Sequence, residues 1–189
     1  WQRKLTAVAR QLHRTQRFDV AHHVTFANDW LPCGLAALRS VPLVWGPVGG
    51  ASHIPYWRLR KWLGWRGLFT EVARDIVTSV PRRIWGRAAA RRAALIVAQN
   101  QDVAHHFARF GPVEIEPNAS LDPIEEIKQP HDQRRSASTK TAVFVGRLIG
   151  LKGVRLALDA VARTDPGSWR LVLFGDGYDR EALQERASR

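Results

Sequence analysis

Short apolar runs alternate with helical patterns along most of this 189-residue chain, and this alternation constrains the fold more than any other feature. Strands are expected at 18–26, 41–45, 94–98, 113–116, 141–145 and 170–174. The clearest runs are apolar at nearly every position, which is typical of strands buried on both faces by covering helices. The sequence therefore predicts an α/β protein with parallel sheets in Rossmann-like units.

A polar and charged stretch at 122–140 interrupts the alternation. It holds Pro123, Pro130 and two serines and has little hydrophobic periodicity, as expected of an interdomain linker. We therefore expect two Rossmann-like domains that face each other across a cleft, with 1–121 as the later part of the first and 141–189 as the first part of the second. Since the chain has no methionine and opens on Trp1 inside a helical pattern, we expect it to be a piece of a longer protein with both domains incomplete.

The cysteine and histidine content excludes several kinds of site. Cys33 is the only cysteine, so an intramolecular disulfide is excluded and a cysteine-based zinc site is not expected. The adjacent pairs His22-His23 and His105-His106 cannot both face one ion from regular structure, so no metal is expected. No apolar run has the length of a membrane-spanning helix. These features favour a reducing, cytoplasmic setting.

The formal net charge of +12 is concentrated between residues 57 and 92, where arginines greatly outnumber acidic residues. Four tryptophans are interleaved with these cations: Trp57, Trp62, Trp65 and Trp85. Because tryptophan prefers the bilayer interface and cations are attracted to anionic lipids, one interpretation is a peripheral membrane surface.

The alternative is a solvated basic face whose apolar residues pack inward, namely Leu59, Leu63, Leu68, Phe69, Val72, Ile76 and Ile84. A basic helix alone does not decide between these two interpretations. Nucleic acid is not expected as a partner, because no recognition motif accompanies the charge.

An anion site is predicted where the strand at 141–145 turns into the next helical pattern. Gly146 and Arg147 follow the strand, and Lys152 and Gly153 precede the helix. In open parallel sheets this turn lies at the carboxyl edge, where ligands bind, and the following helix adds free N–H groups. A phosphate-bearing ligand fits this arrangement and is favoured over the alternative, in which both cations are ordinary exposed turn residues.

The motifs of this region resemble the C-terminal domain of group 1 glycosyltransferases, which have the GT-B fold and use nucleotide-sugar donors with retention. The resemblance rests on Phe144-Val-Gly-Arg-Leu148, on Lys152-Gly153, and on Phe174-Gly-Asp-Gly177 followed by Arg180 and Leu183. Upstream, Phe18-Asp-Val-Ala-His-His23, Val44-Trp-Gly-Pro-Val-Gly-Gly50 and Glu116-Pro-Asn118 resemble the later half of the family's N-terminal domain.

The resemblance implies a nucleotide-sugar-binding role for 141–189 and an acceptor-side role for 1–121. Arg147 and Lys152, with Gly146, would grip the diphosphate of the donor, which gains charge as the glycosidic bond breaks. The turn Gly175-Asp176-Gly177 would lie beside the nucleotide, or would be a plain capped turn. The donor is a substrate, so no cofactor and no obligatory metal are implied.

The resemblance also implies roles in the first domain. His22 or His23 would be the catalytic histidine that contacts the transferred sugar, and side-chain alternation allows only one of them to face the cleft. A satisfied structural histidine is the alternative for each. The acceptor-side loop would comprise Gly46, Gly49, Gly50 and His53, unless it is only a tight strand exit.

Two features of the family are missing from this chain, the glycine-rich loop near the N-terminus and the paired glutamates beyond Gly177. We therefore expect the isolated chain to be inactive, and the whole protein to be a retaining, hexosyltransferase-like enzyme. It would transfer a sugar from a nucleotide-diphosphate donor to a hydroxyl of a saccharide or lipid-linked acceptor in cell-envelope polysaccharide synthesis. Its location would be cytoplasmic, with possible attachment to the cytoplasmic face of the membrane.

Two other functions remain open from sequence. A sugar-nucleotide epimerase shares this architecture, and would isomerise its donor rather than transfer the sugar. A non-enzymatic basic module would bind membranes or nucleic acid whether or not Arg147 is present.

Overall fold

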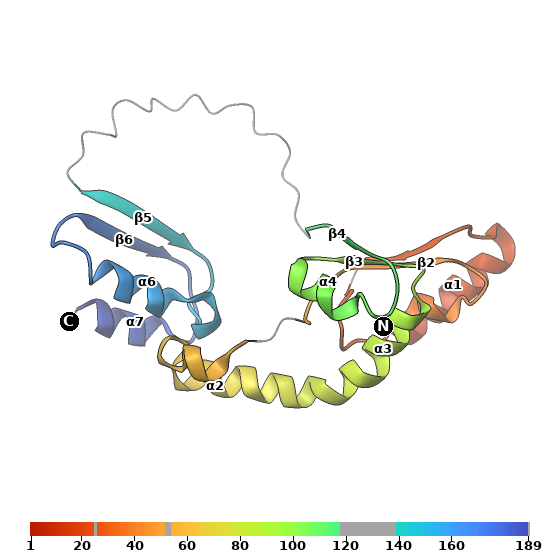
Figure 1. The fold of residues 1–189 in the computed structure, drawn as a ribbon, viewed down its shortest axis with the longest axis horizontal. Helices are drawn as coiled ribbons and strands as arrows, with labels where there is room; N and C mark the ends of the chain where they lie inside the picture. Colours follow the sequence, from red (N-terminus) through yellow and green to blue (C-terminus); the bar gives the residue numbers. More distant parts are fainter. Residues whose placement is uncertain (25, 52–53, 118–138, 189) are drawn as a thin grey trace, which may run out of the picture. The chain divides into compact units, whose positions relative to one another are not determined.

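The computed structural model describes residues 1–24, 26–51, 54–117 and 139–188, which fall into two compact units (Figure 1). The first unit comprises Trp1–Ile54 and Asp75–Asp122, and the second comprises Pro55–Arg74 and Pro123–Arg189. The sequence assigned residues 55–74 to the first domain, whereas they pack with the second unit. Residues 122–138 of the predicted linker lie outside the described residues, and Lys140 already belongs to a strand.

The first unit is built on a parallel sheet with the strand order β1-β2-β3-β4. Its strands are β1 (Ala21–His23), β2 (Leu43–Val48), β3 (Leu95–Ala98) and β4 (Val113–Ile115). Its helical segments are α1 (Gln2–Gln16), the 3-10 turn Gly34–Ala37, the π-helical segment Arg82–Gly86, α3 (Arg87–Arg92) and α4 (Gln101–Phe107). The prediction of an α/β protein with parallel strands is confirmed for this unit.

The core of the first unit lies between the sheet and the helices that follow its strands. Trp45 of β2 is 1% exposed and packs edge-to-face on Phe107 of α4, with ring centroids 5.2 Å apart. Leu43, Val48 and Ile96 have no measurable exposure. Asn100 caps α4, because its side-chain oxygen accepts a hydrogen bond from the Val103 N–H at 3.1 Å. The helix therefore starts at a fixed point directly after β3.

Three predicted boundaries in the first unit were wrong. The strand expected at 18–26 is confined to Ala21–His23, and the helix expected near 31–38 is only a 3-10 turn. The strand expected to end at Trp45 continues to Val48, so Gly46 lies inside β2 instead of in a loop. Gly46 fits this central position because an added Cβ would collide with the carbonyl oxygen of Val97 on the adjacent strand β3.

Helix α2 (Tyr56–Pro81) follows the glycine-rich segment and is interrupted at Gly64, whose φ of 68° and ψ of 171° are not helical. Its residues as far as Arg74 belong to the second unit, and the rest belong to the first. In the part of the chain that the structure describes, no helix combines the length and apolar character needed to cross a membrane.

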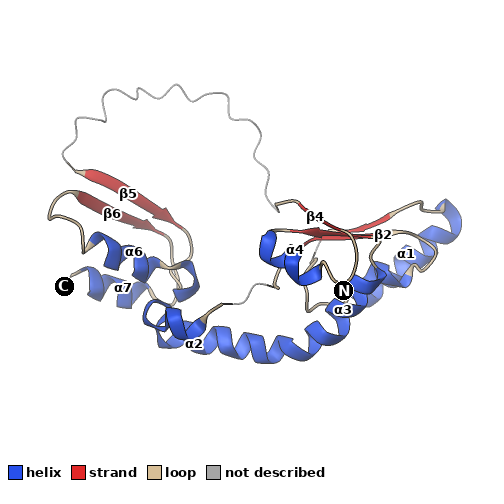
Figure 2. Ribbon diagram, viewed as in Figure 1, coloured by secondary structure: helices blue, strands red, loops and turns tan. Residues whose placement is uncertain are grey.

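The second unit contains two parallel strands, β5 (Lys140–Val145) and β6 (Trp169–Phe174). Figure 2 shows helices α6 (Val154–Val161) and α7 (Arg180–Ala187) on one side of this pair. The core is small and consists of Leu148, Val154 and Leu183, with Phe144, Leu158 and Leu173 packed against it.

The second unit departs from one expectation of the sequence. The strand at 141–145 was predicted to be buried on both faces, but Val143 is 58% exposed and Val145 is 77% exposed. Phe144 alternates with them and faces the core. Among the described residues, helices cover only one face of the two strands, so the alternate side chains remain accessible.

Gly46→Ala tests the role of β2 in the first unit. We expect a loss of about 2–4 kcal/mol in the free energy of unfolding, because the change combines a strained φ with a clash against the Val97 carbonyl. Gly49→Ala is the matched control, since its added Cβ would meet only the end of the flexible Gln99 side chain. Chemical denaturation measures both, and equal losses would contradict this account.

Candidate functional site

The two strand-to-helix loops of the second unit lie side by side at the carboxyl ends of β5 and β6. Their backbones are joined by hydrogen bonds from Gly146 N–H to Phe174 O at 3.0 Å and from Leu148 N–H to Asp176 O at 2.8 Å. A third bond runs from Asp179 N–H to Leu148 O at 3.1 Å. The structure thus brings together the Gly146-Arg147 motif and the Gly-Asp-Gly turn, which are far apart in the sequence.

The hydrogen bonding between the two loops explains why glycines occupy positions 175 and 177 of the second turn. A Cβ at Gly175 would collide with the carbonyl oxygen of Gly146, and one at Gly177 would collide with that of Leu148. Both residues also have positive φ, 149° at Gly175 and 159° at Gly177. Packing between the loops therefore requires glycine at these positions, whether or not a ligand lies beside them.

Asp176 behaves as a local turn residue. Its carboxylate accepts a hydrogen bond from the Gly177 N–H at 2.9 Å and lies 3.7 Å from Arg180. Its side chain is 81% exposed. These contacts match the plain turn that the sequence offered as an alternative to a nucleotide contact.

A partly buried ion pair fixes the two helices that leave these loops. Arg155, in the first turn of α6, donates a hydrogen bond of 2.8 Å to Asp179, which is 3% exposed and precedes α7. Since a buried carboxylate needs such a partner, the pair ties the starts of α6 and α7 together. The loops before both helices are positioned as a consequence.

Arg147 and Lys152 lie on the turn between β5 and α6, as predicted, and both are exposed. Within the described residues, neither side chain has an ion pair or a hydrogen bond. Other cations of the second unit differ in this respect, because Arg155 is paired with Asp179, while Lys61 and Arg186 are paired with Asp159.

Asp159 of α6 also anchors the start of α2. It accepts a hydrogen bond from Trp62 Nε1 at 3.2 Å and lies 3.6 Å from Lys61. The hydrogen bonds from Arg186 are the main reason that the pKa of Asp159 lies below its ordinary value. Trp62, one of the four tryptophans of the basic region, is therefore part of the second unit's own packing.

The candidate histidines belong to the first unit and point to opposite faces of β1, as the alternation predicted. His22 is exposed, and its Nε2 lies 3.0 Å from the Gly46 carbonyl oxygen. His23 is 3% exposed. Burial lowers the pKa of His23 below its ordinary value of 6.5, and the adjacent His22 lowers it further. His23 is thus a neutral core side chain at neutral pH.

The predicted acceptor-side loop is smaller than expected. Gly46 lies in the strand, while Gly49 and Gly50 follow it; His53 lies outside the described residues. Gly50 has a φ of 103°, and an added Cβ would meet a carboxylate oxygen of Asp29. The backbone of Asp29 pairs with the same segment, because its N–H donates to the Gly49 carbonyl oxygen at 3.2 Å.

A charged cluster surrounds Asp29 beside the end of β2, and no sequence pattern predicted it. Asp29 is 2% exposed, and its Oδ2 lies 2.8 Å from Nε of Arg82, which also lies 3.3 Å from Asp75. Arg82 was one of many arginines in the basic region, and no motif marked Asp29. Only the approach of residues 27–29 to the end of β2 brings these groups together.

Among the described residues, no group of three or more histidine, cysteine or acidic side chains is arranged to hold a metal ion. Cys33 is free, and burial raises the pKa of its thiol.

Neither a scan against protein-family models nor a search of curated proteins finds a match to this chain.

The lowered pKa of His23 predicts a stability change with pH. As the pH falls below about 6.5, the unfolded chain binds a proton at this position before the folded chain does, so folding becomes less favourable by up to about 1.4 kcal/mol per pH unit. We expect His23→Gln to remove this part of the decline and His22→Gln to retain most of it. Thermal denaturation across this pH range measures the effect, and parallel curves for wild type and His23→Gln would contradict it.

Proposed function

We propose that this chain carries the diphosphate-binding turn of a retaining GT-B glycosyltransferase that uses a nucleotide-sugar donor. The observation that carries the proposal is the state of Arg147 and Lys152. Both are exposed and have no partner within the described residues, at the carboxyl edge of two parallel strands, whereas Arg155 in the first turn of the following helix is held in an ion pair. Ligands of open α/β sheets bind at this edge.

The proposed chemistry needs positive charge at this position. When the bond between the sugar and the diphosphate breaks, negative charge develops on the leaving phosphate oxygens. Arg147 would present a planar fork of donors to those oxygens, and Lys152 would supply a compact charge. The N–H groups in the first turn of α6 add a further favourable field, because they have no partners within the helix.

The two units correspond in this proposal to the two Rossmann-like domains of a GT-B enzyme. The second unit would bind the nucleotide sugar, and the first would receive a saccharide or lipid-linked hydroxyl acceptor. Since His23 is buried and neutral, His22 is the better placed of the two histidines to meet a sugar hydroxyl. Gly49 and Gly50 would belong to the acceptor side.

The transferase is favoured over a sugar-nucleotide epimerase by the residues at the donor turn. Epimerisation requires acid and base groups around the sugar, and the acidic groups beside Arg147 are otherwise engaged. Asp179 is buried against Arg155, and Asp176 closes its own turn. Product analysis of the whole protein separates the two reactions, since an epimerase changes the donor without an acceptor.

We expect Arg147→Ala and Lys152→Ala each to weaken the binding of pyrophosphate and of nucleoside diphosphates by about tenfold, because each removes a charge-assisted contact. Arg163→Ala is the matched control, since Arg163 is an exposed cation beyond the end of α6. Titration calorimetry with uridine, guanosine and adenosine diphosphates measures the affinities. Equal affinity in all variants would refute the diphosphate site and would favour the basic-module alternative.

We also propose that the start of α2 contacts the cytoplasmic face of an anionic membrane, where a lipid-linked acceptor would be found. Trp57 is 77% exposed, Trp65 is 81% exposed and Phe69 is 68% exposed. With Tyr56, Leu68 and Val72 they line an apolar groove of about 390 Å³. Of the residues expected to pack inward, Leu63 does so, whereas Phe69 does not. Exposed cations flank this surface: Arg58, Arg60, Lys61 and Arg66.

This surface predicts binding to vesicles that contain phosphatidylserine or phosphatidylglycerol. We expect Trp57→Ala with Trp65→Ala to weaken binding by at least tenfold, because both rings would insert at the interface. Trp169→Ala is the control, since Trp169 is 41% exposed but lies on β6. Co-sedimentation measures binding, and retention by the double variant would show that charge alone is responsible.

A further inference from the structure

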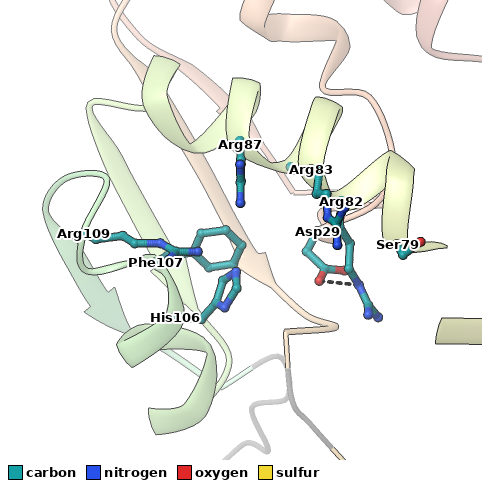
Figure 3. Close-up of a pocket in the computed structure, with 9 residues that line it drawn as sticks. Asp29, Ser79, Arg82, Arg83, Arg87, His106, Phe107 and Arg109 are labelled. Atoms are coloured by element: carbon teal, nitrogen blue, oxygen red, sulfur yellow. Dashed lines mark ion pairs between the residues drawn. The ribbon is translucent and has the colours of Figure 1, made fainter. Parts of the chain in front are cut away.

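A cavity of about 220 Å³ lies in the first unit, between the π-helical segment with the start of α3 and the end of α4. Figure 3 shows that the side chains lining the cavity project from two separate helical regions. Arg82, Arg83 and Arg87 come from the π-helical segment and the start of α3, while Phe107 and Arg109 come from the end of α4 and the residues after it. Asp29 completes the wall next to Arg82.

The cavity has a strong excess of positive charge, with four arginines against one aspartate. Arg82 is engaged by Asp29 at 2.8 Å and by Asp75 at 3.3 Å. Within the described residues, Arg83 and Arg87 have no ion pair or hydrogen bond. Arg109 lies over the ring of Phe110 at 4.9 Å, a contact that leaves its N–H donors available. Three guanidinium groups with free donors therefore meet at one cavity, which favours an anion.

We propose that this cavity binds a compact phosphate monoester, with the phosphate at Arg83, Arg87 and Arg109. The volume of about 220 Å³ is below that of pockets for drug-sized ligands, so a compact group fits and a nucleotide does not. The site is separate from the diphosphate turn of the second unit and does not depend on the proposed transferase activity.

The test uses the whole chain with Arg147→Ala and Lys152→Ala, so that the proposed diphosphate site cannot contribute. Titration with glycerol 3-phosphate is followed by calorimetry and by the side-chain N–H signals of arginine in NMR spectra. We expect saturable binding that weakens about tenfold in Arg87→Ala and about tenfold in Arg109→Ala. Arg91→Ala is the matched control, because Arg91 is exposed on α3 and does not line the cavity. Absence of binding, or equal losses in Arg87→Ala and Arg91→Ala, would overturn the proposal.

A competition experiment identifies the source of the phosphate group. Competition by phosphatidylglycerol vesicles would identify a lipid headgroup as the source of the ligand, whereas binding without such competition would identify a free polyol phosphate.

Discussion

The arrangement of the second unit depends on the backbone pairing between the loops that follow β5 and β6. Leu148 both donates to Asp176 and accepts from Asp179, so one residue of the first loop is held by two of the second. The glycines at 175 and 177 permit this close approach, and the Arg155–Asp179 pair closes it from the helical side. The pair is costly to break from the arginine side, because loss of Arg155 would leave the buried Asp179 carboxylate without its charged partner. The turn that bears Arg147 and Lys152 is thus held by its surroundings rather than by its own side chains.

Because other residues hold this turn in place, the exposed cations on it are evidence for a ligand site. Surface arginines and lysines usually contribute little to stability, and a cation held in an ion pair has already lost part of its capacity to bind a ligand. In the second unit, the paired cations fix the helices to each other and to α2, through Asp179 and Asp159. Arg147 and Lys152 have no structural contact of this kind within the described residues, so an external anion would meet them without displacing a partner.

The sequence predicted features that depend on local pattern and missed those that depend on tertiary approach. Apolar runs between helical patterns correctly predicted β3, β5 and β6. The spacing of glycines and cations correctly predicted that Arg147 and Lys152 lie on the turn after β5. Gly46 was misplaced because a glycine after an apolar run usually ends a strand, whereas here it lets β2 approach the Val97 carbonyl. The exposure of Val143 could not be foreseen, since an apolar strand does not reveal how many of its faces will be covered.

The charged cluster at Asp29 also depends on tertiary approach, so sequence patterns could not predict it. Asp29 and Arg82 are separated by more than a strand and most of a helix in the sequence, and neither lies in a recognisable motif. They meet because residues 27–29 run beside the end of β2 and because Gly86, on the helical segment, allows its backbone to approach the Asp29 carbonyl. The arginines that complete the cavity come from the π-helical segment, from α3 and from the residues after α4, so no single stretch of sequence contains them. Because the guanidinium groups of Arg83 and Arg87 have no partner among the described residues, an anion would meet them without displacing an ion pair.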